Sequence, residues 1–204
     1  MDNKLIIEDF LKKLKLHNEY NNTQLKYGEL LEINGVNLSG IEMIKKDINS
    51  AILFNINFDN ANLEECDMYG CYLVSSSFNN ANLSVVNLNK ANLDYTSFIN
   101  AVLTNITGVR ASFFNSNLER ANLSYSDLRG VDLREANLRK AVLIETNLEK
   151  ADFTGANMYN TDLRGAKGIE STYTSWIDVG KEGFPRRLKG TEMTKWLLDA
   201  VNRS

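Results

Sequence analysis

Residues 120–143 read RANLSYSDLRGVDLREANLRKAVL, with leucines at positions 123, 128, 133, 138 and 143. A spacing of five residues suits neither common secondary structure. On an α-helix, five residues turn the chain through about 500°, so these leucines would form no stripe. In a strand, an odd spacing sends successive side chains to opposite faces. The pattern therefore requires a backbone that changes direction once in every five residues.

The same register extends far beyond this stretch. Of the 27 positions taken every five residues from Ile33 to Leu163, 26 hold Leu, Ile, Met or Phe, and Gly108 is the exception. Two residues earlier, 22 of 27 positions hold Ala, Ser, Thr, Cys or Val, and one residue earlier 17 hold Asn or Asp. In an extended backbone the large and small residues point into one core, and Asn and Asp favour turns. We expect a solenoid of stacked coils, with a bulge at Gly108.

The number of sides in each coil is less clearly marked. Phe58, Phe78 and Phe98 recur at 20 residues, which favours four sides, although Phe113 and Phe153 stand outside that series. The stretches ANLSY, ANLRK, ADFTG and ANMYN resemble the A(D/N)LXX signature of the pentapeptide-repeat family. This resemblance covers about residues 31–168. It implies an all-β solenoid, a right-handed quadrilateral β-helix of about seven coils.

A stack of coils leaves exposed core at both ends, so we expect short α-helical caps at both termini. Apolar residues at helical spacing predict a first helix over residues 3–16, within a cap and lead-in of residues 1–30. The β-helix is expected over residues 31–170, followed by a loop and a helix in 171–204. Thr191 is the expected N-cap of that last helix.

The last helix has two alternative roles. One of its faces carries the apolar residues Met193, Trp196, Leu197 and Val201. These residues either cover the last coil or form a contact between two copies of the chain. The resemblance implies the second role, because members of the family that protect topoisomerases pair through C-terminal elements.

Residues suited to catalysis or to metal binding are few and scattered. His17 is the only histidine and falls near the end of the first helix. Cys66 and Cys71 occupy small inward positions, where cysteine acts as a compact hydrophobe. The sequence has no glycine-rich phosphate loop and no zinc signature. We therefore expect no enzymatic activity, no cofactor and no metal site.

The composition fits a single soluble domain. The chain has 204 residues, 43% of them hydrophobic and 24% charged, and a net charge of −3. A weakly acidic chain argues against direct nucleic-acid binding. The sequence shows no run of 18 apolar residues, no secretory signal and too few cysteines for a disulfide framework. We expect a cytoplasmic protein with no membrane contact.

Over four coils, one side of the expected shaft carries more apolar outward residues than the other sides do over comparable coils. On the side whose inward residues include Leu53, Leu73, Leu93 and Phe113, six of twelve outward positions are apolar or aromatic. These six residues are Ile52, Phe54, Tyr72, Val74, Tyr95 and Phe114. A contiguous apolar patch often marks a contact surface. It is expected either to bind a protein partner or to lie beneath a helix or loop of the same chain.

These features favour a non-enzymatic scaffold that binds an unidentified protein through one face of the solenoid. The alternative comes from the resemblance. Some family members that protect against quinolones or gyrase-directed toxins are similar to duplex DNA in shape and negative charge, and bind topoisomerases. Mimicry of DNA needs a strongly acidic face, whereas residues 33–100 carry a net charge of −4 and residues 101–168 carry +1.

Overall fold

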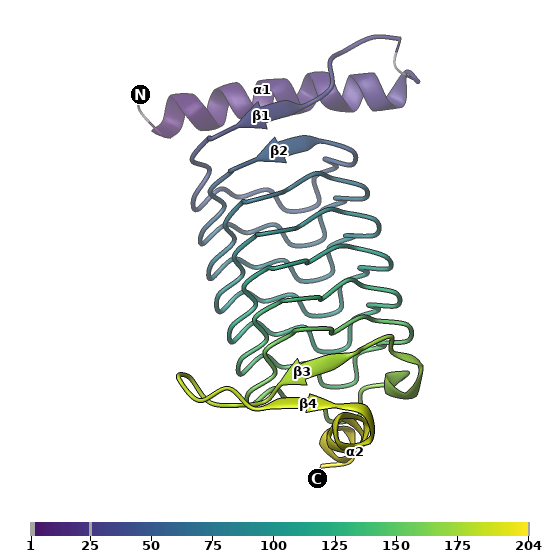
Figure 1. The fold of residues 1–204 in the computed structure, drawn as a ribbon. Helices are drawn as coiled ribbons and strands as arrows, with labels where there is room; N and C mark the ends of the chain where they lie inside the picture. The colour runs from purple at the N-terminus through teal and green to yellow at the C-terminus, as the bar shows by residue number, and fades with distance from the viewer. Residues whose placement is uncertain (1–2, 25, 204) are drawn as a thin grey trace.

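Two helices close the ends of a long stack of coils. The computed structural model of the protein describes residues 3–24 and 26–203. The elements are α1 (Asn3–Asn22), β1 (Glu32–Asn34), β2 (Ile52–Phe54), the 3₁₀-helix η1 (Ile169–Ser171), β3 (Trp176–Asp178), β4 (Arg187–Lys189) and α2 (Gly190–Val201). Helix α1 crosses one end of the stack, and α2 lies at the other end beside β4 (Figure 1). In the described part of the chain, neither helix is both long and apolar enough to span a bilayer.

Successive coils pair through parallel backbone bridges between residues twenty apart. Strand β1 pairs with β2 in the register Ile33↔Leu53, and single bridges continue from Asn37↔Asn57 to Asn147↔Lys167. The bridges recur every five residues, so each coil has four sides. The fold predicted from the sequence, a right-handed quadrilateral β-helix of about seven coils with a helix at each terminus, is confirmed (Figure 1).

A tight turn follows every side of the coil. After Phe58, the Ala61 N–H donates to the Phe58 carbonyl at 3.0 Å, and Asn60 has a φ of 59°. A positive φ at the third residue of a four-residue turn is typical of type II turns, which favour Gly and Asn there. Val85 occupies an equivalent position with a φ of 63°. Because a β-branched residue is unfavourable in this region, the stacked coils impose the turn even where the local sequence opposes it.

The inward residues form a closely packed column. The large residues at every fifth position are at most 9% exposed. The rings of Phe58, Phe78 and Phe98 stack with centroids 4.9 and 5.0 Å apart, close to the separation of neighbouring strands in a sheet. Small inward residues add hydrogen bonds between coils, as Thr146 Oγ1 donates to the Leu123 carbonyl at 3.0 Å. The twenty-residue series of phenylalanines therefore reports the circumference of the coil.

The bulge expected at Gly108 is wrong. Thr107 bridges to both Asn87 and Asp127, so the register passes through this coil unbroken, and Val109 stays partly exposed on the outside. A Cβ atom placed on Gly108 would lie 2.8 Å from Cδ2 of Leu128. The leucine of the next coil thus occupies the space that an inward side chain would need, and the backbone keeps its usual path.

The N-terminal helix is longer than expected and is anchored by a buried histidine. Helix α1 ends at Asn22, and His17 lies inside it, fully buried, rather than near its end. His17 Nδ1 accepts a hydrogen bond from the Leu31 N–H at 3.1 Å, and Nε2 lies 2.8 Å from the Asn49 carbonyl oxygen. Burial lowers the pKa of His17, and the hydrogen bond to Asn49 opposes this shift without cancelling it. The neutral imidazole therefore ties α1 to the first coil.

A hairpin and a helix close the C-terminal end. Strands β3 and β4 pair antiparallel where the sequence predicts a loop. Helix α2 begins at Gly190 with Lys189 in the N-cap position, and no side chain caps it. The N-cap expected at Thr191 is therefore wrong, because that residue already lies in the first turn. The preceding strand leads directly into the helix and leaves no turn for a capping side chain.

The apolar face of α2 packs against the chain's own core. Met193 and Leu197 are buried, and Trp196 and Val201 are partly buried against the same cluster. These four residues therefore take the first of their two expected roles, as part of the cap. The contact between two copies of the chain stays a prediction, and Met193 and Leu197 have little exposed surface left to contribute to it.

Candidate partner-binding face

The six apolar residues identified from the register lie on one side of the shaft, here called side 1. Its inward residues are those in the series that contains Leu53, Leu73 and Leu93, and it runs from β1 and β2 towards β3 (Figure 1). Tyr72 and Tyr95 are 51% and 54% exposed, and the other four residues are partly exposed. No described segment of the chain therefore covers the two tyrosines.

The apolar residues of side 1 form two clusters rather than one continuous patch. The upper cluster, on two adjacent coils joined by the bridge Ile52↔Tyr72, consists of Ile52, Phe54, Tyr72 and Val74. The next coil places Asn92 and Asp94 at the equivalent positions. Tyr95, on that same coil, and Phe114, on the one after it, form the lower cluster, and their rings meet edge to face with centroids 5.6 Å apart. A polar row thus divides the patch that the sequence predicts.

A guanidinium group borders the lower cluster. The Cζ atom of Arg134 lies 5.6 Å from the centroid of the Phe114 ring, within reach of a cation–π contact. Arg134 also donates from Nε and Nη2 to the two carboxylate oxygens of Asp132, at 2.9 and 2.6 Å. Burial of Asp132 disfavours its charge, but the hydrogen bonds from Arg134 outweigh burial and lower the pKa of Asp132. The pair is therefore ionised and neutral overall.

Four other carboxylates of side 1 have no ion-pair partner among residues 3–24 and 26–203. They are Glu32, Asp94, Glu135 and Asp152. Asp94 Oδ1 accepts hydrogen bonds from the Phe114 N–H at 3.1 Å and from the Ser112 hydroxyl. These neutral donors orient Asp94 without cancelling its charge. With Asp132 and Arg134 included, side 1 carries a net charge of −4.

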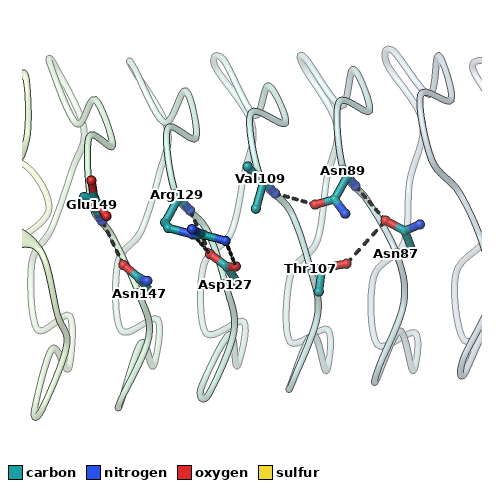
Figure 2. A network of polar contacts seen from close by, with 8 residues as sticks. All are labelled: Asn87, Asn89, Thr107, Val109, Asp127, Arg129, Asn147 and Glu149. Carbon is teal, nitrogen blue, oxygen red and sulfur yellow. Dashed lines mark hydrogen bonds and ion pairs between the residues drawn. The ribbon is translucent and has the colours of Figure 1, made fainter.

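The adjoining side 4, whose inward residues include Leu88 and Leu128, has mostly polar residues at the equivalent positions, with Tyr69 and Val109 as exceptions. Figure 2 shows Asn87, Thr107, Asp127 and Asn147 in one column of this side and Asn89, Val109, Arg129 and Glu149 in the other. Asn87 Oδ1 accepts from Thr107 Oγ1 at 3.3 Å and from the Asn89 N–H at 3.1 Å. Arg129 donates to the Asp127 carboxylate at 2.8 and 2.7 Å. Many polar groups of side 4 thus bond to one another, whereas side 1 presents exposed aromatic rings beside its carboxylates.

The two cysteines lie in the core. Cys66 and Cys71 are buried, and their thiols donate to the carbonyls of Met43 and Ile48 at 2.7 and 2.9 Å. Burial raises the pKa of Cys66 to about 11 and that of Cys71 to about 12. Both therefore stay protonated near neutral pH, where a reactive cysteine needs its thiolate. Within the described residues, no three His, Cys, Asp or Glu side chains are grouped to hold a metal ion.

Sequence reasoning found the apolar residues of side 1 and missed the charged groups around them. Asp94 directly follows the inward Leu93, so the same register count places it between the two clusters. The contact between Arg134 and Phe114 joins two coils and depends on side-chain conformation. No pattern in the sequence identifies that contact.

The bridged coils, the buried column and the two end caps define a repeat solenoid of the β-helix class. The sequence matches the family model "Pentapeptide repeats" in eight copies, over residues 51–89, 81–105, 111–149 and 132–167. These segments together span more than half of the chain. The chain belongs to the pentapeptide-repeat family. No curated protein matches it.

Solved structures of other pentapeptide-repeat proteins are similar at low identity. HetL, which is involved in heterocyst differentiation regulation in the cyanobacterium Nostoc sp. strain PCC 7120, is 23% identical with a TM-score of 0.28, over 66% of this chain and 86% of HetL. A trypsin-treated form of QnrB1, a plasmid-mediated fluoroquinolone resistance protein, is 21% identical with a TM-score of 0.30, over 67% of this chain and 77% of that one. A protein of the Arabidopsis thaliana thylakoid lumen is 17% identical with a TM-score of 0.24, over 84% of this chain and 90% of that one. None of these similarities bears on what this chain binds.

Proposed function

We propose that this protein is a non-enzymatic scaffold that holds a protein partner on side 1 of its solenoid. The observation that carries the proposal is the exposure of Tyr72 and Tyr95, at 51% and 54%, on the side that also presents four further apolar residues. Tyrosine offers a large rigid contact area with a polar tip, and it is enriched at the centres of protein interfaces.

The rigidity of the shaft supports this role. Each outward residue of side 1 sits on backbone that is bonded to the coils before and after it, as the Leu73 N–H donates to the Asn92 carbonyl at 2.8 Å and the Leu53 N–H to the Tyr72 carbonyl at 2.7 Å. A surface that is already ordered loses little conformational entropy when a partner binds. Side 1 therefore holds its rings in place before binding.

Photo-crosslinking in the native cell tests the proposal. A benzophenone amino acid placed at position 72 or 95 is expected to capture a protein. The same residue placed at 125 serves as the control, because Tyr125 is 62% exposed but belongs to another side. Phe54→Asp and Phe114→Asp should abolish capture while the chain stays folded. Equal capture from position 125, or none from side 1, would refute the role of this face.

Binding to a topoisomerase through mimicry of DNA is the second candidate function. The unpaired carboxylates of side 1 favour it, since they resemble a row of phosphates in charge. Side 4, with five basic and four acidic outward residues, disfavours it. A gyrase supercoiling assay with added protein, in the presence and absence of a quinolone, decides the matter. We expect neither inhibition nor protection if side 1 serves another partner.

A further inference from the structure

We propose that the occupant of side 1 is a basic amphipathic α-helix of the partner protein. This inference rests on the proposed function and specifies the chemistry of the partner. Three properties of side 1 support it: the state of its backbone, its dimensions and the order of its charges.

The backbone of side 1 excludes an added β-strand. Neighbouring coils use its N–H and carbonyl groups, as in the bond from the Leu93 N–H to the Ser112 carbonyl at 2.8 Å. A strand that extends a sheet needs a free edge, and the two ends of this stack are occupied by α1 and by β4 with α2 (Figure 1). A partner on side 1 is therefore bound through side chains alone, as a helix is when it lies in a groove or on a flat face.

The dimensions of side 1 match a single helix. From Glu32 to Asp152 the side spans six coil steps of ~4.8 Å, roughly 29 Å in all. Its three outward positions in each coil give a width of roughly 10 Å at ~3.3 Å per residue. A helix of about 20 residues is about 30 Å long and 10–12 Å wide. A standard protein–protein interface buries about 800 Å² of accessible surface on each partner, so a globular partner would have to extend beyond this strip onto the neighbouring sides.

The two clusters fit the period of a helix that lies along the shaft. The middle of the upper cluster and Phe114 are separated by two and a half coils, roughly 12 Å. Two turns of an α-helix advance about 11 Å. Apolar residues at positions i and i+3 or i+4 would contact Tyr72 and its neighbours, and residues at i+7 and i+11 would reach Tyr95 and Phe114, respectively.

The charges of side 1 select a basic helix. Asp94 lies between the clusters, Glu32 lies beyond the upper cluster, and Glu135 and Asp152 lie beyond the lower one. None of these carboxylates has an ion-pair partner among the described residues. Lysine or arginine along the flanks of the helix would face them. An acidic helix of the same shape would be repelled, because like charges across an interface oppose association.

Two synthetic helical peptides of 20 residues test the inference against the full-length chain. They share leucines at i, i+3, i+7 and i+11, and they carry either lysine or glutamate at the polar positions. We expect fluorescence anisotropy to show that the lysine peptide binds at least tenfold more tightly than the glutamate peptide. Tyr72→Asp should abolish this binding, and Tyr125→Asp should leave it unchanged. Equal binding of the two peptides, or no binding of either, overturns the inference.

A matched pair of charge variants separates a local effect from the net charge of the protein. The first variant, E32Q/D94N/E135Q/D152N, removes four charges from side 1 and keeps an oxygen acceptor at each position. The second, E42Q/E64Q/E65Q/E145Q, removes four charges from the opposite side. Only the first should weaken the lysine peptide, by about tenfold, while circular dichroism shows that both variants are folded. Equal weakening by both variants contradicts a site on side 1.

The native crosslinking experiment distinguishes failure of this inference from failure of the proposed function. If position 72 captures a protein but the crosslinked segment is not a basic helix, the helix inference fails and the scaffold role stands. If side 1 captures nothing, the scaffold role fails as well. Capture of a basic helical segment supports both.

Discussion

The shaft and the N-terminal cap are stabilised in different ways. In the shaft, residues 31–168, one set of contacts recurs in every coil, with a large inward residue, a small one beside it and a bridge to the coil twenty residues away. In the cap, α1 is joined to the first coil by contacts that do not repeat. They are the buried imidazole of His17, the hydrogen bonds from Asn21 to Asn49, and the buried side chains of Phe10 and Leu14. Because these contacts repeat in the shaft, the shaft can be recognised in the sequence as a regular five-residue pattern. The cap depends instead on a few specific contacts that follow no repeat.

Removal of an inward leucine from the shaft should have the largest effect. Leu123→Ala leaves a cavity in a fully buried column, and we expect the free energy of unfolding to fall by about 2–5 kcal/mol. Denaturant titration measures the change. Leu5→Ala, the same substitution at a residue of α1 that is 58% exposed, is the control and should have almost no effect. Similar losses in both variants would mean that burial in the column does not determine the effect of removing a leucine side chain.

Removal of the histidine should weaken the cap. His17→Leu leaves the buried Leu31 N–H without its acceptor, and we expect a loss of about 1–3 kcal/mol. In the His17→Leu variant, amide hydrogen exchange should be accelerated more at Leu31 than at Leu123, relative to the original chain. Lys13→Leu, an exposed change on the same helix, serves as the control. If the leucine variant is as stable as the original chain, the imidazole is not the anchor of α1.

The same histidine should make stability depend on pH. Burial lowers the pKa of His17 below its ordinary value of 6.5, so in mildly acidic solution the unfolded chain takes up a proton that the folded chain refuses. Stability is therefore unaffected by His17 above pH 6.5 and falls as the pH drops below that value, by at most about 1.4 kcal/mol per pH unit. The His17→Leu variant should lack this slope between pH 6.5 and pH 5. A slope that persists in the variant would assign the effect to other groups.

The fold was predictable from the sequence because its contacts repeat. Twenty-six large residues in one unbroken register exclude both a helix and a straight strand, and they require a coil that turns every five residues. The register also placed Tyr72 and Phe114 on one side. The hydrogen bond between His17 and Leu31 was not predictable, because it joins a helix to a coil through a single tertiary contact. The N-cap at Thr191 was wrongly predicted because the sequence does not show that strand β4 leads directly into the helix.

Turn residues offer a smaller test within the shaft. Val85 has a φ of 63°, and Asn105 occupies the same corner one coil further on, with a φ of 58°. Asparagine tolerates this region better than valine does, so Val85→Asn should raise the stability by about 1 kcal/mol. The reverse change, Asn105→Val, should lower it by a similar amount. Thermal unfolding of the two variants measures both, and shifts of the same sign would show that the turn geometry does not control the outcome.

The smallest expected effect concerns the hydroxyl groups inside the column. Ser126 Oγ donates to the Leu103 carbonyl at 3.0 Å, whereas the buried Oγ of Ser116 has no hydrogen-bond partner among the described residues. We expect Ser126→Ala to cost about 1 kcal/mol and Ser116→Ala to change stability by less than about 0.5 kcal/mol. Chemical denaturation of the two variants in parallel resolves the difference. Equal losses would indicate that the hydroxyl of Ser116 is bonded in solution.

The unbroken count of residues from Ile33 to Leu163 governs how such a chain can change its length. An insertion of twenty residues would add one coil and leave the sides of the coils before and after it aligned. An insertion of five residues would rotate the register of all later coils by one side. Placed between Val74 and Tyr95, it would move Phe114 to a different side of the shaft from Tyr72. Side 1 can therefore lengthen only by whole coils of twenty residues. The upper and lower clusters face the same direction because the number of residues between them keeps this register.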